Sequence, residues 1–386
     1  MRSALQTSFQ RRHSFVESMQ SVASMHGDLA VEPSRLRGAT RMIGRTSAIA
    51  AAALIAFTGL APSARADAVA DFYKGKQISL IVGTSTGNDY DFRGRLLARH
   101  LGRFIPGNPT IIPRNMPGAG GINAANWLAN VAPRDGTAIH MIMANMMNKQ
   151  AVGVPGVKFD ARQFSWIGNT TSTPNVTSAW HTSGVKTIQD AKERELIIGA
   201  PAGTAGEVYG AVMNALAGTK FKVVTGYPGG NEVNLAMERG EIQGRASNSW
   251  ASWKSTRPNW VRDKKLIVLV QVALKRDPEL KDIPTLIELV KSERDRKFMA
   301  FLSAETTVAR ALVAPPEVPA DRINALRRAF DMTVKDPQFL ADAAKMGGMD
   351  IQPMTGEEAQ PIAHGIVNTS PDVIEYARKV LGNLLR

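Results

Sequence analysis

The 386-residue sequence contains no cysteine, and it has six histidines in all. Without cysteine, disulfides, thiolate metal sites, cysteine nucleophiles and lipid attachment through cysteine are excluded. No group of His, Asp and Glu has the spacing of a metal site, so we expect neither a metal nor a cofactor. The rest of the composition, 44% hydrophobic and 21% charged, is typical of a globular protein long enough for two domains.

No apolar run is long enough to cross a bilayer, which takes roughly 18–20 residues. The nearest candidate, Ala48–Phe57, follows Arg41 and Arg45 and precedes a small-x-small site that ends at Ala66. This pattern predicts a signal peptide spanning residues 1–66, cleavage after about Ala66 and an exported protein. A translation start at Met42 would give a signal of ordinary length. The alternative to a signal peptide is that this N-terminal segment is a disordered or organelle-targeting tail.

The chain is basic, with a formal charge of +13. Residues 1–66 contain eight Arg and three acidic residues, so the remainder carries +8. Its Lys and Arg are spread along the sequence without an aromatic-interleaved basic motif, and nucleic-acid binding therefore has little support. A positive balance also suits a protein that handles anions.

Short apolar runs alternate with segments of helical periodicity in two β-α series. This predicts an α/β fold with two lobes, each a mainly parallel sheet flanked by helices, and a hinge between them. We expect residues 67–172 and 273–386 in lobe 1, residues 173–272 in lobe 2, and chain exchange near 172–180 and 268–275. The predicted strands are 78–82, 109–112, 138–143, 164–169, 185–187, 196–200, 222–224, 242–245 and 266–271. The predicted helices include 122–131, 206–216, 231–239, 283–291, 321–335, 337–346, 357–366 and 372 to the end.

Residues 83–87 match G-x-S-x-G, the pattern that exposes a serine nucleophile on a strand-to-helix turn. A hydrolase would also need upstream strands for its oxyanion hole and a later histidine. The predicted mature chain begins only 18 residues before Ser85, and both His100 and His364 lie in helical patterns. An exported serine hydrolase using Ser85 therefore remains only an alternative.

Two other interpretations of this turn remain. Its glycines can simply close it, or the hydroxyls of Thr84, Ser85 and Thr86 can hold an anion together with N–H groups at the start of the next helix. We favour the anion site. Asp89 and Asp91 follow it, and either can cap the helix. Asp91 can instead face the cavity and accept a ligand hydrogen bond, which would set selectivity.

Glycine-rich turns recur at 115–121, 199–206 and 227–231. None is G-x-G-x-x-G followed by an acidic residue at ribose-binding spacing, so dinucleotide binding is weakly supported. The second turn offers Thr204 and backbone N–H groups to an anion, whereas a purely structural role is the alternative for each turn. Trp250 follows a further strand; we expect it in the core rather than stacked on a ligand.

Taken in order, these motifs resemble the periplasmic substrate-binding proteins of tripartite tricarboxylate transporters, the Bug family. The similarity spans nearly all of residues 71–385, and the Asn-x-Pro-Gly-Ala-Gly-Gly turn with the later Pro-Arg-Asp-Gly is its most specific part. The matching segments are 71–76, 87–91 with 95–98, 115–121, 132–137, 226–230, 280–285 and 314–316.

The resemblance implies a hinge-closing, non-catalytic binding protein that passes a small carboxylate to membrane transporter subunits. Family members hold the carboxylate through loops that correspond here to residues 84–91 and 202–206. We expect a monomer whose ligand contacts are Thr84, Ser85, Thr86, Asp91, Asn145, Thr170, Thr171, Ala202, Gly203, Thr204 and Tyr227.

The first loop departs from the family pattern, which commonly has proline and small residues there. Asp89 adds a carboxylate that disfavours a plain tricarboxylate ligand unless it faces solvent. Glu207 likewise stands where small or polar residues are usual. Two further alternatives are a solute sensor with a receptor partner and a structural protein that binds no ligand.

Overall fold

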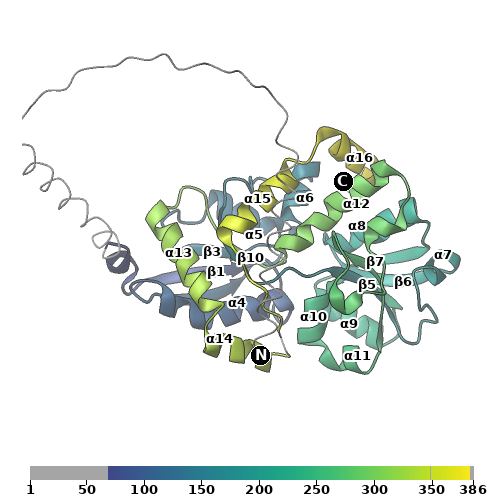
Figure 1. Cartoon of the computed structure of the whole chain (residues 1–386), viewed down its shortest axis with the longest axis horizontal. Helices are drawn as coiled ribbons and strands as arrows, with labels where there is room; N and C mark the ends of the chain where they lie inside the picture. Colours follow the sequence, from purple (N-terminus) through teal and green to yellow (C-terminus); the bar gives the residue numbers. More distant parts are fainter. Residues whose placement is uncertain (1–67, 348, 383–386) are drawn as a thin grey trace, which may run out of the picture. The chain divides into compact units, whose positions relative to one another are not determined.

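Two β-sheets, each covered by helices, contain the named strands of the computed structural model (Figure 1). The structure describes residues 68–347 and 349–382. The predicted signal peptide, its cleavage site after Ala66 and the alternative start at Met42 lie outside these residues.

The first sheet has six strands: β1 (Gln77–Val82), β2 (Thr110–Asn115), β3 (Ala138–Met141), β4 (Ser165–Asn169), β10 (Ala311–Ala314) and β11 (Met354–Thr355). Their order is β11-β4-β10-β3-β1-β2. β1 pairs in parallel with β2 and β3, whereas β10 is antiparallel to β3 and β4. The helices in contact with this sheet are α4 (Asp89–His100), α5 (Ile122–Asn130), α13 (Ala320–Thr333) and α15 (Gly356–Val367), with α6 (Met146–Val152) and α14 (Pro337–Lys345) packed on those helices.

The second sheet has five strands: β5 (Asn175–Trp180), β6 (Leu196–Pro201), β7 (Phe221–Tyr227), β8 (Gly244–Ser249) and β9 (Leu266–Val272). Their order is β7-β6-β8-β5-β9. β6 is parallel to β7 and β8, and β5 is antiparallel to β8 and β9. Its helices are α7 (Asp190–Glu193), α8 (Ala205–Val212), α9 (Gly230–Glu238), α10 (Trp250–Thr256) and α11 (Pro258–Arg262).

Each sheet with its helices is one lobe, so the predicted two-lobed α/β fold is confirmed. β1 pairs in parallel with β2 and β3, and β6 pairs in parallel with β7 and β8. The remaining pairs are antiparallel, so both sheets are mixed. The chain passes from β4 to β5 and returns from β9 through α12 (Glu293–Ala304), on which the last helix α16 (Pro371–Leu381) packs (Figure 1). The exact lobe boundaries, 172/173 and 272/273, stay a prediction.

Several segments differ from the sequence-based expectation. Residues 185–187 form no strand, and within 283–291 only Leu286–Leu289 is helical, as one 3-10 turn. Residues 170–174 join β4 to β5, and the predicted chain exchange near 172–180 and 268–275 stays a prediction. Trp250 is buried in the core of the second lobe, as expected, and its Nε1 donates to Glu279 at 2.7 Å.

Close packing of β4 against α13 generates a test of the first lobe. A Cβ atom on Gly168 would overlap the ring of Phe330. We expect Gly168→Ala to lower the free energy of unfolding by about 1–3 kcal/mol, because overpacking forces side chains and backbone to shift. Urea unfolding followed by circular dichroism measures this change.

Gly365→Ala is the matched control. Gly365 is exposed in α15, and nothing lies within 4 Å of its would-be Cβ. There alanine should stabilise by about 0.5–1 kcal/mol, because glycine costs more backbone entropy in a helix. Equal unfolding curves for Gly168→Ala and the wild type would contradict the packing described here.

Candidate functional site

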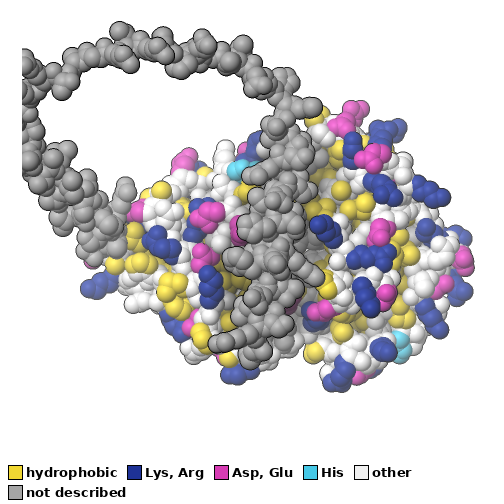
Figure 2. Space-filling view, viewed as in Figure 1, with side chains coloured by type: hydrophobic (Ala, Val, Ile, Leu, Met, Phe, Trp, Pro, Cys, Tyr) yellow, Lys and Arg dark blue, Asp and Glu magenta, His cyan; other side chains and the backbone are white. Residues whose placement is uncertain are grey.

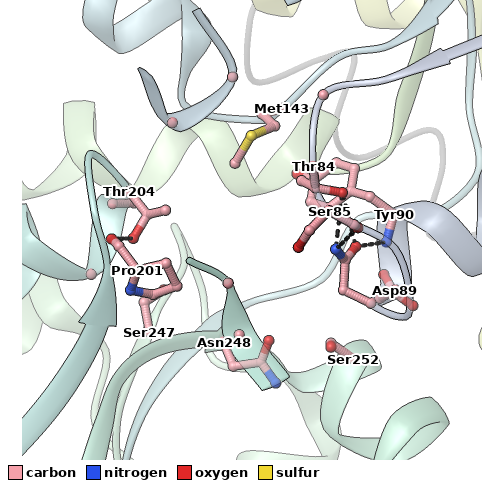
Figure 3. Close-up of a pocket in the computed structure, with 18 of the residues that line it drawn as sticks. Thr84, Ser85, Asp89, Tyr90, Met143, Pro201, Thr204, Ser247, Asn248 and Ser252 are labelled. Carbon is pink, nitrogen blue, oxygen red and sulfur yellow. Dashed lines mark hydrogen bonds between the residues drawn. The ribbon is translucent and has the colours of Figure 1, made fainter. Parts of the chain in front are cut away.

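A cavity of about 350 Å³ lies between the two lobes. It is lined by the strand-to-helix turns that follow β1, β2 and β3 in the first lobe and β6, β7 and β8 in the second (Figure 3). The carboxyl ends of parallel strands are the expected place for a ligand in such sheets. We call this cavity the cleft.

In the first lobe, Asn88 organises the turn before α4. Its Oδ1 accepts from the N–H groups of Tyr90 and Asp91 at 3.0 and 3.2 Å, and its Nδ2 donates to the carbonyl of Ser85 at 2.6 Å. The hydroxyl of Thr84 is hydrogen-bonded to the same amide. Asn88, which the sequence analysis did not assign to the site, therefore occupies N–H groups that were expected to bind an anion.

Ser85 is the member of the predicted hydroxyl trio that remains available to a ligand. It lines the cleft (Figure 3), and a Cβ on Gly229 of the second lobe would lie 2.7 Å from its Oγ. Thr84 also lines the cleft but is engaged by Asn88. Thr86 is exposed and does not line the cleft, so its predicted contact is not supported.

Asp91 does not face the cleft, and the selectivity role predicted for it is wrong. Its carboxylate accepts from Gly87 N at 2.9 Å, from Arg95 Nε at 3.0 Å and from Asn115 Nδ2 at 3.0 Å. Burial alone would raise the pKa of Asp91, but these hydrogen bonds lower it below the usual value. Asp91 thus fixes the turn between β1 and α4.

Asp89 lines the cleft, and two arginines more than offset its negative charge. Arg93 Nε lies 3.1 Å from its carboxylate and Arg310 Nε 2.6 Å, and all three side chains are buried. Burial opposes ionisation, yet the two arginines bring the pKa of Asp89 down to about 2. Because one carboxylate lies between two guanidinium groups, this group of three side chains is net positive, and Asp89 is compatible with an anion in the cleft.

The same ion pairs reach across the cleft. From the second lobe, Ser255 Oγ donates to Asp89 at 3.2 Å, and Ser249 Oγ accepts from Arg310 NH2 at 2.6 Å. The guanidinium of Arg310 also lies over the ring of Tyr90, 4.0 Å from its centroid. Sequence reasoning missed Arg310, because no local pattern shows that residue 310 reaches the start of α4.

Arg245 is a second buried cation in the wall of the cleft, and sequence reasoning missed it too. It donates to the carbonyls of Ser247 and Gly230 and to Asn234 Oδ1, at 3.1, 3.2 and 2.8 Å. No carboxylate among residues 68–347 and 349–382 forms a salt bridge with it. Burial lowers its pKa to about 9, so the group stays cationic at neutral pH. A charged residue inside the predicted strand 242–245 was the available signal.

The second lobe contributes the start of α8. Thr204 lines the cleft and precedes α8 without capping it, since its Oγ1 donates to Pro201 O at 2.8 Å. Ala202 and Tyr227 also line the cleft. Gly203 does not, and its carbonyl instead meets the first lobe.

The glycine-rich turns bring the two lobes into contact. Lys149 Nζ, in the first lobe, donates to Gly120 O at 3.0 Å and to Gly203 O at 2.9 Å. Gly120 has a φ of 55°, and a Cβ there would overlap the Gly203 carbonyl. On another side of the cleft, Asn231 Nδ2 donates to Gly87 O at 3.1 Å. Glycine at these turns therefore permits lobe closure.

The remaining predicted contacts divide between the cleft and the hinge. Asn145 lines the cleft, is 7% exposed, and its Oδ1 has no hydrogen-bond partner. Thr170 and Thr171 do not line it, which corrects their assignment. They are buried in the segment joining β4 to β5, where Thr170 Oγ1 donates to Arg310 O at 3.3 Å.

Ser85 has no histidine hydrogen-bonded to it among the described residues. His140 Nδ1 donates to Ile81 O at 2.9 Å, and burial lowers the pKa of this imidazole to about 4. His100 Nε2 lies 3.1 Å from Asp342, at the end of α4 away from the turn. The geometry gives no support to a Ser–His pair.

On the face shown in Figure 2, Lys and Arg are interspersed with Asp and Glu over both lobes. Across residues 68–347 and 349–382, the helices are all too short or too polar to span a bilayer. In the same residues, His, Asp and Glu form no group suited to holding a metal ion.

The Asp89 cluster generates a pH-dependent prediction. Because its folded-state pKa is depressed from 3.8 to about 2, its contribution to stability is full above about pH 4. The contribution is lost as the pH falls through 2. Asp89→Asn should lower the free energy of unfolding at pH 7 by about 3–5 kcal/mol, because it leaves two buried arginines underpaired.

Urea unfolding from pH 7 to pH 2 measures this effect. The difference between the wild type and Asp89→Asn should shrink toward the acid end. Asp263→Asn, which removes a surface partner of Arg262, is the control and should change little. A wild-type-like stability of Asp89→Asn at pH 7 would refute the stabilising role of the ion pairs that Asp89 forms with Arg93 and Arg310.

Comparisons with known proteins agree with this geometry. A family model described as "Tripartite tricarboxylate transporter family receptor" matches residues 95–377. A curated relative, "UPF0065 protein in gbd 5'region" of Cupriavidus necator, is 26% identical over 337 residues, covering 84% of this chain and 94% of that protein.

Solved structures share the fold. The periplasmic binding protein BugD superposes with a TM-score of 0.63 at 18% identity, covering 80% of this chain and 98% of that one. The structure of R. palustris Rpa4515 with adipate superposes with a TM-score of 0.60 at 18% identity, covering 80% of this chain and 97% of that one. MatC from Rhodopseudomonas palustris, with bound malate, superposes with a TM-score of 0.58 at 16% identity, covering 78% of this chain and 99% of that one. From the match over residues 95–377, the chain belongs to the tripartite tricarboxylate transporter receptor family, whose structural neighbours are two-lobed solute-binding proteins.

Proposed function

We propose that this protein is a periplasmic, non-catalytic solute-binding protein that captures a small organic carboxylate in the cleft and delivers it to membrane transporter subunits. One observation carries the proposal. The buried guanidinium of Arg245 forms no salt bridge in the described part of the chain, although the charge of Glu232 acts on its pKa, and it lines a cavity shared by strand-to-helix turns of both lobes. Arg245 has only neutral hydrogen-bond acceptors, and a buried cation without a salt bridge is costly, so an anionic ligand would supply a counter-ion.

The cleft offers three kinds of donor to a carboxylate. The hydroxyl of Ser85 comes from the first lobe, and the uncapped N–H groups at the start of α8 come from the second. An anion near a helix N-terminus gains about 0.3–1 kcal/mol for each contact. Arg245 adds a full positive charge in a desolvated wall, where charge-assisted hydrogen bonds are stronger than neutral ones.

Relatives support a carboxylate rather than another anion. Two neighbours with this fold were solved with adipate and with malate, and both ligands are dicarboxylates. The lobe-to-lobe contacts through Lys149 and Asn231 suit a closed state that encloses a ligand. A ligand that prefers this closed state would shift the protein toward it, and the transporter could then recognise the closed form.

A thermal-shift screen of mono-, di- and tricarboxylates, aromatic acids and amino acids tests the proposal. A ligand present at a hundred times its dissociation constant should stabilise the folded protein by about 2.7 kcal/mol. Arg245→Met should weaken the best carboxylate at least about tenfold in calorimetric titration, because losing a charged hydrogen bond costs about 1.5–3 kcal/mol. Arg245→Lys should recover part of the affinity.

The matched control is Arg262→Met. Arg262 is exposed and paired with Asp263, and it does not line the cleft. Its substitution should leave affinity unchanged. If no carboxylate in the screen stabilises the protein, or if Arg245→Met binds like the wild type, the carboxylate function is wrong.

A further inference from the structure

A second cavity, of about 250 Å³, adjoins the cleft. Ala119, Asn145, Thr204, Ala205 and Glu305 line both cavities, so the two share one wall. We call the second cavity the side chamber. Most of its lining is apolar and comes from helices of both lobes and their connections, including Ile122, Val152, Val208, Phe301, Leu302 and Leu381.

Lys149 is the cationic side chain that lines the side chamber, and backbone carbonyl groups already accept its hydrogen bonds. An ammonium group has three N–H donors and no acceptor. Lys149 Nζ lies 3.3, 3.0 and 2.9 Å from the carbonyl oxygens of Ala119, Gly120 and Gly203. A ligand anion in the side chamber would have to displace one of these contacts.

Two carboxyl groups also line the side chamber. Glu305 is buried and accepts a hydrogen bond from Tyr209 at 2.5 Å. Burial raises the pKa of Glu305 to about 7, against the opposing effects of Tyr209 and Lys149. Burial also raises the pKa of Glu207, the other carboxyl. A second carboxylate on a ligand would meet these acids without a free cation.

The cleft and the side chamber therefore suit opposite ends of one molecule. We propose that the solute is a monocarboxylate with an apolar body, whose carboxylate lies in the cleft and whose body extends into the side chamber. This inference rests on the proposed function and narrows its ligand class. At the shared wall, the unpartnered Oδ1 of Asn145 can accept one hydrogen bond from a hydroxyl or amide on the body.

Calorimetric titration of the full chain with a homologous series tests the inference. The probes are straight-chain monocarboxylates from butanoate to octanoate, and hexanedioate as the dicarboxylate matched to hexanoate. Affinity for the monocarboxylates should rise about fourfold with each added methylene until the chamber is full, as burial of apolar surface predicts. Hexanedioate should bind about tenfold or more weakly than hexanoate, because its second carboxylate would be buried in the side chamber without a free cation or donor to pair with it.

Three variants locate the effect. Val208→Phe fills the side chamber from α8 and should flatten the dependence on chain length. Val131→Phe is the matched control; Val131 is 69% exposed and lines neither cavity, so the wild-type dependence should persist. Glu207→Gln removes one carboxylate from the chamber and should narrow the gap between hexanoate and hexanedioate.

The failure of this inference differs from that of the proposed function. If hexanedioate binds at least as tightly as hexanoate, or if Val208→Phe keeps the wild-type series, the side chamber does not hold the ligand and the inference is overturned while carboxylate capture stands. If no carboxylate binds at all, the proposed function falls and the inference falls with it.

Discussion

Asp89 is a buried carboxylate in the wall of the proposed anion site, and the cleft depends on how its charge is offset. Asp89 stands where α4 begins, 2% exposed, and would repel an anionic ligand if its charge were unbalanced. Arg93 and Arg310 supply the balance at 3.1 and 2.6 Å. Since Ser249 and Ser255 of the second lobe join the same network, neutralising the charge also ties the lobes together.

With the charge of Asp89 offset by two arginines, Arg245 and Arg310 give the polar part of the cleft a net positive charge. The apolar side chamber on the other side of the shared wall has acids and an occupied lysine instead. Positive charge therefore lies in the cleft, and apolar and acidic side chains lie in the adjoining side chamber. The two cavities together thus distinguish the ends of a ligand, which a uniformly polar cleft could not do. Specificity of this kind depends on what the site disfavours as well as on what it attracts.

Much of the architecture could be predicted from the sequence, because strand and helix periodicity are local properties. The runs around β1, β6 and β9 are examples, as are the glycine turns after β1, β2, β6 and β7, which line the cleft or join the lobes. β10, with only Ala311–Ala314, was missed because a short run of small and apolar residues carries little periodic signal. The 12-residue helix α12 was missed as well.

The candidate site was harder to predict than the fold. Ser85, Thr84, Asn145, Ala202, Thr204 and Tyr227 were placed in the cleft by their position at strand ends. The orientation of Asp91 depends on Arg95 and on Asn115 from the next strand. The hydroxyl of Thr170 donates to the backbone carbonyl of Arg310 and so does not face the cleft. Partners such as Arg310 and Asp89 lie 221 residues apart in sequence, so only the tertiary structure shows that they meet.

A crystal structure of the protein with its tightest-binding carboxylate would test the central claim most directly. The account predicts carboxylate oxygens between Ser85 and Thr204, within hydrogen-bonding distance of the start of α8, and an Asp89 carboxylate still held by both arginines. A ligand bound outside the cleft, or an Asp89 released from Arg93 and Arg310 to contact the ligand, would contradict it.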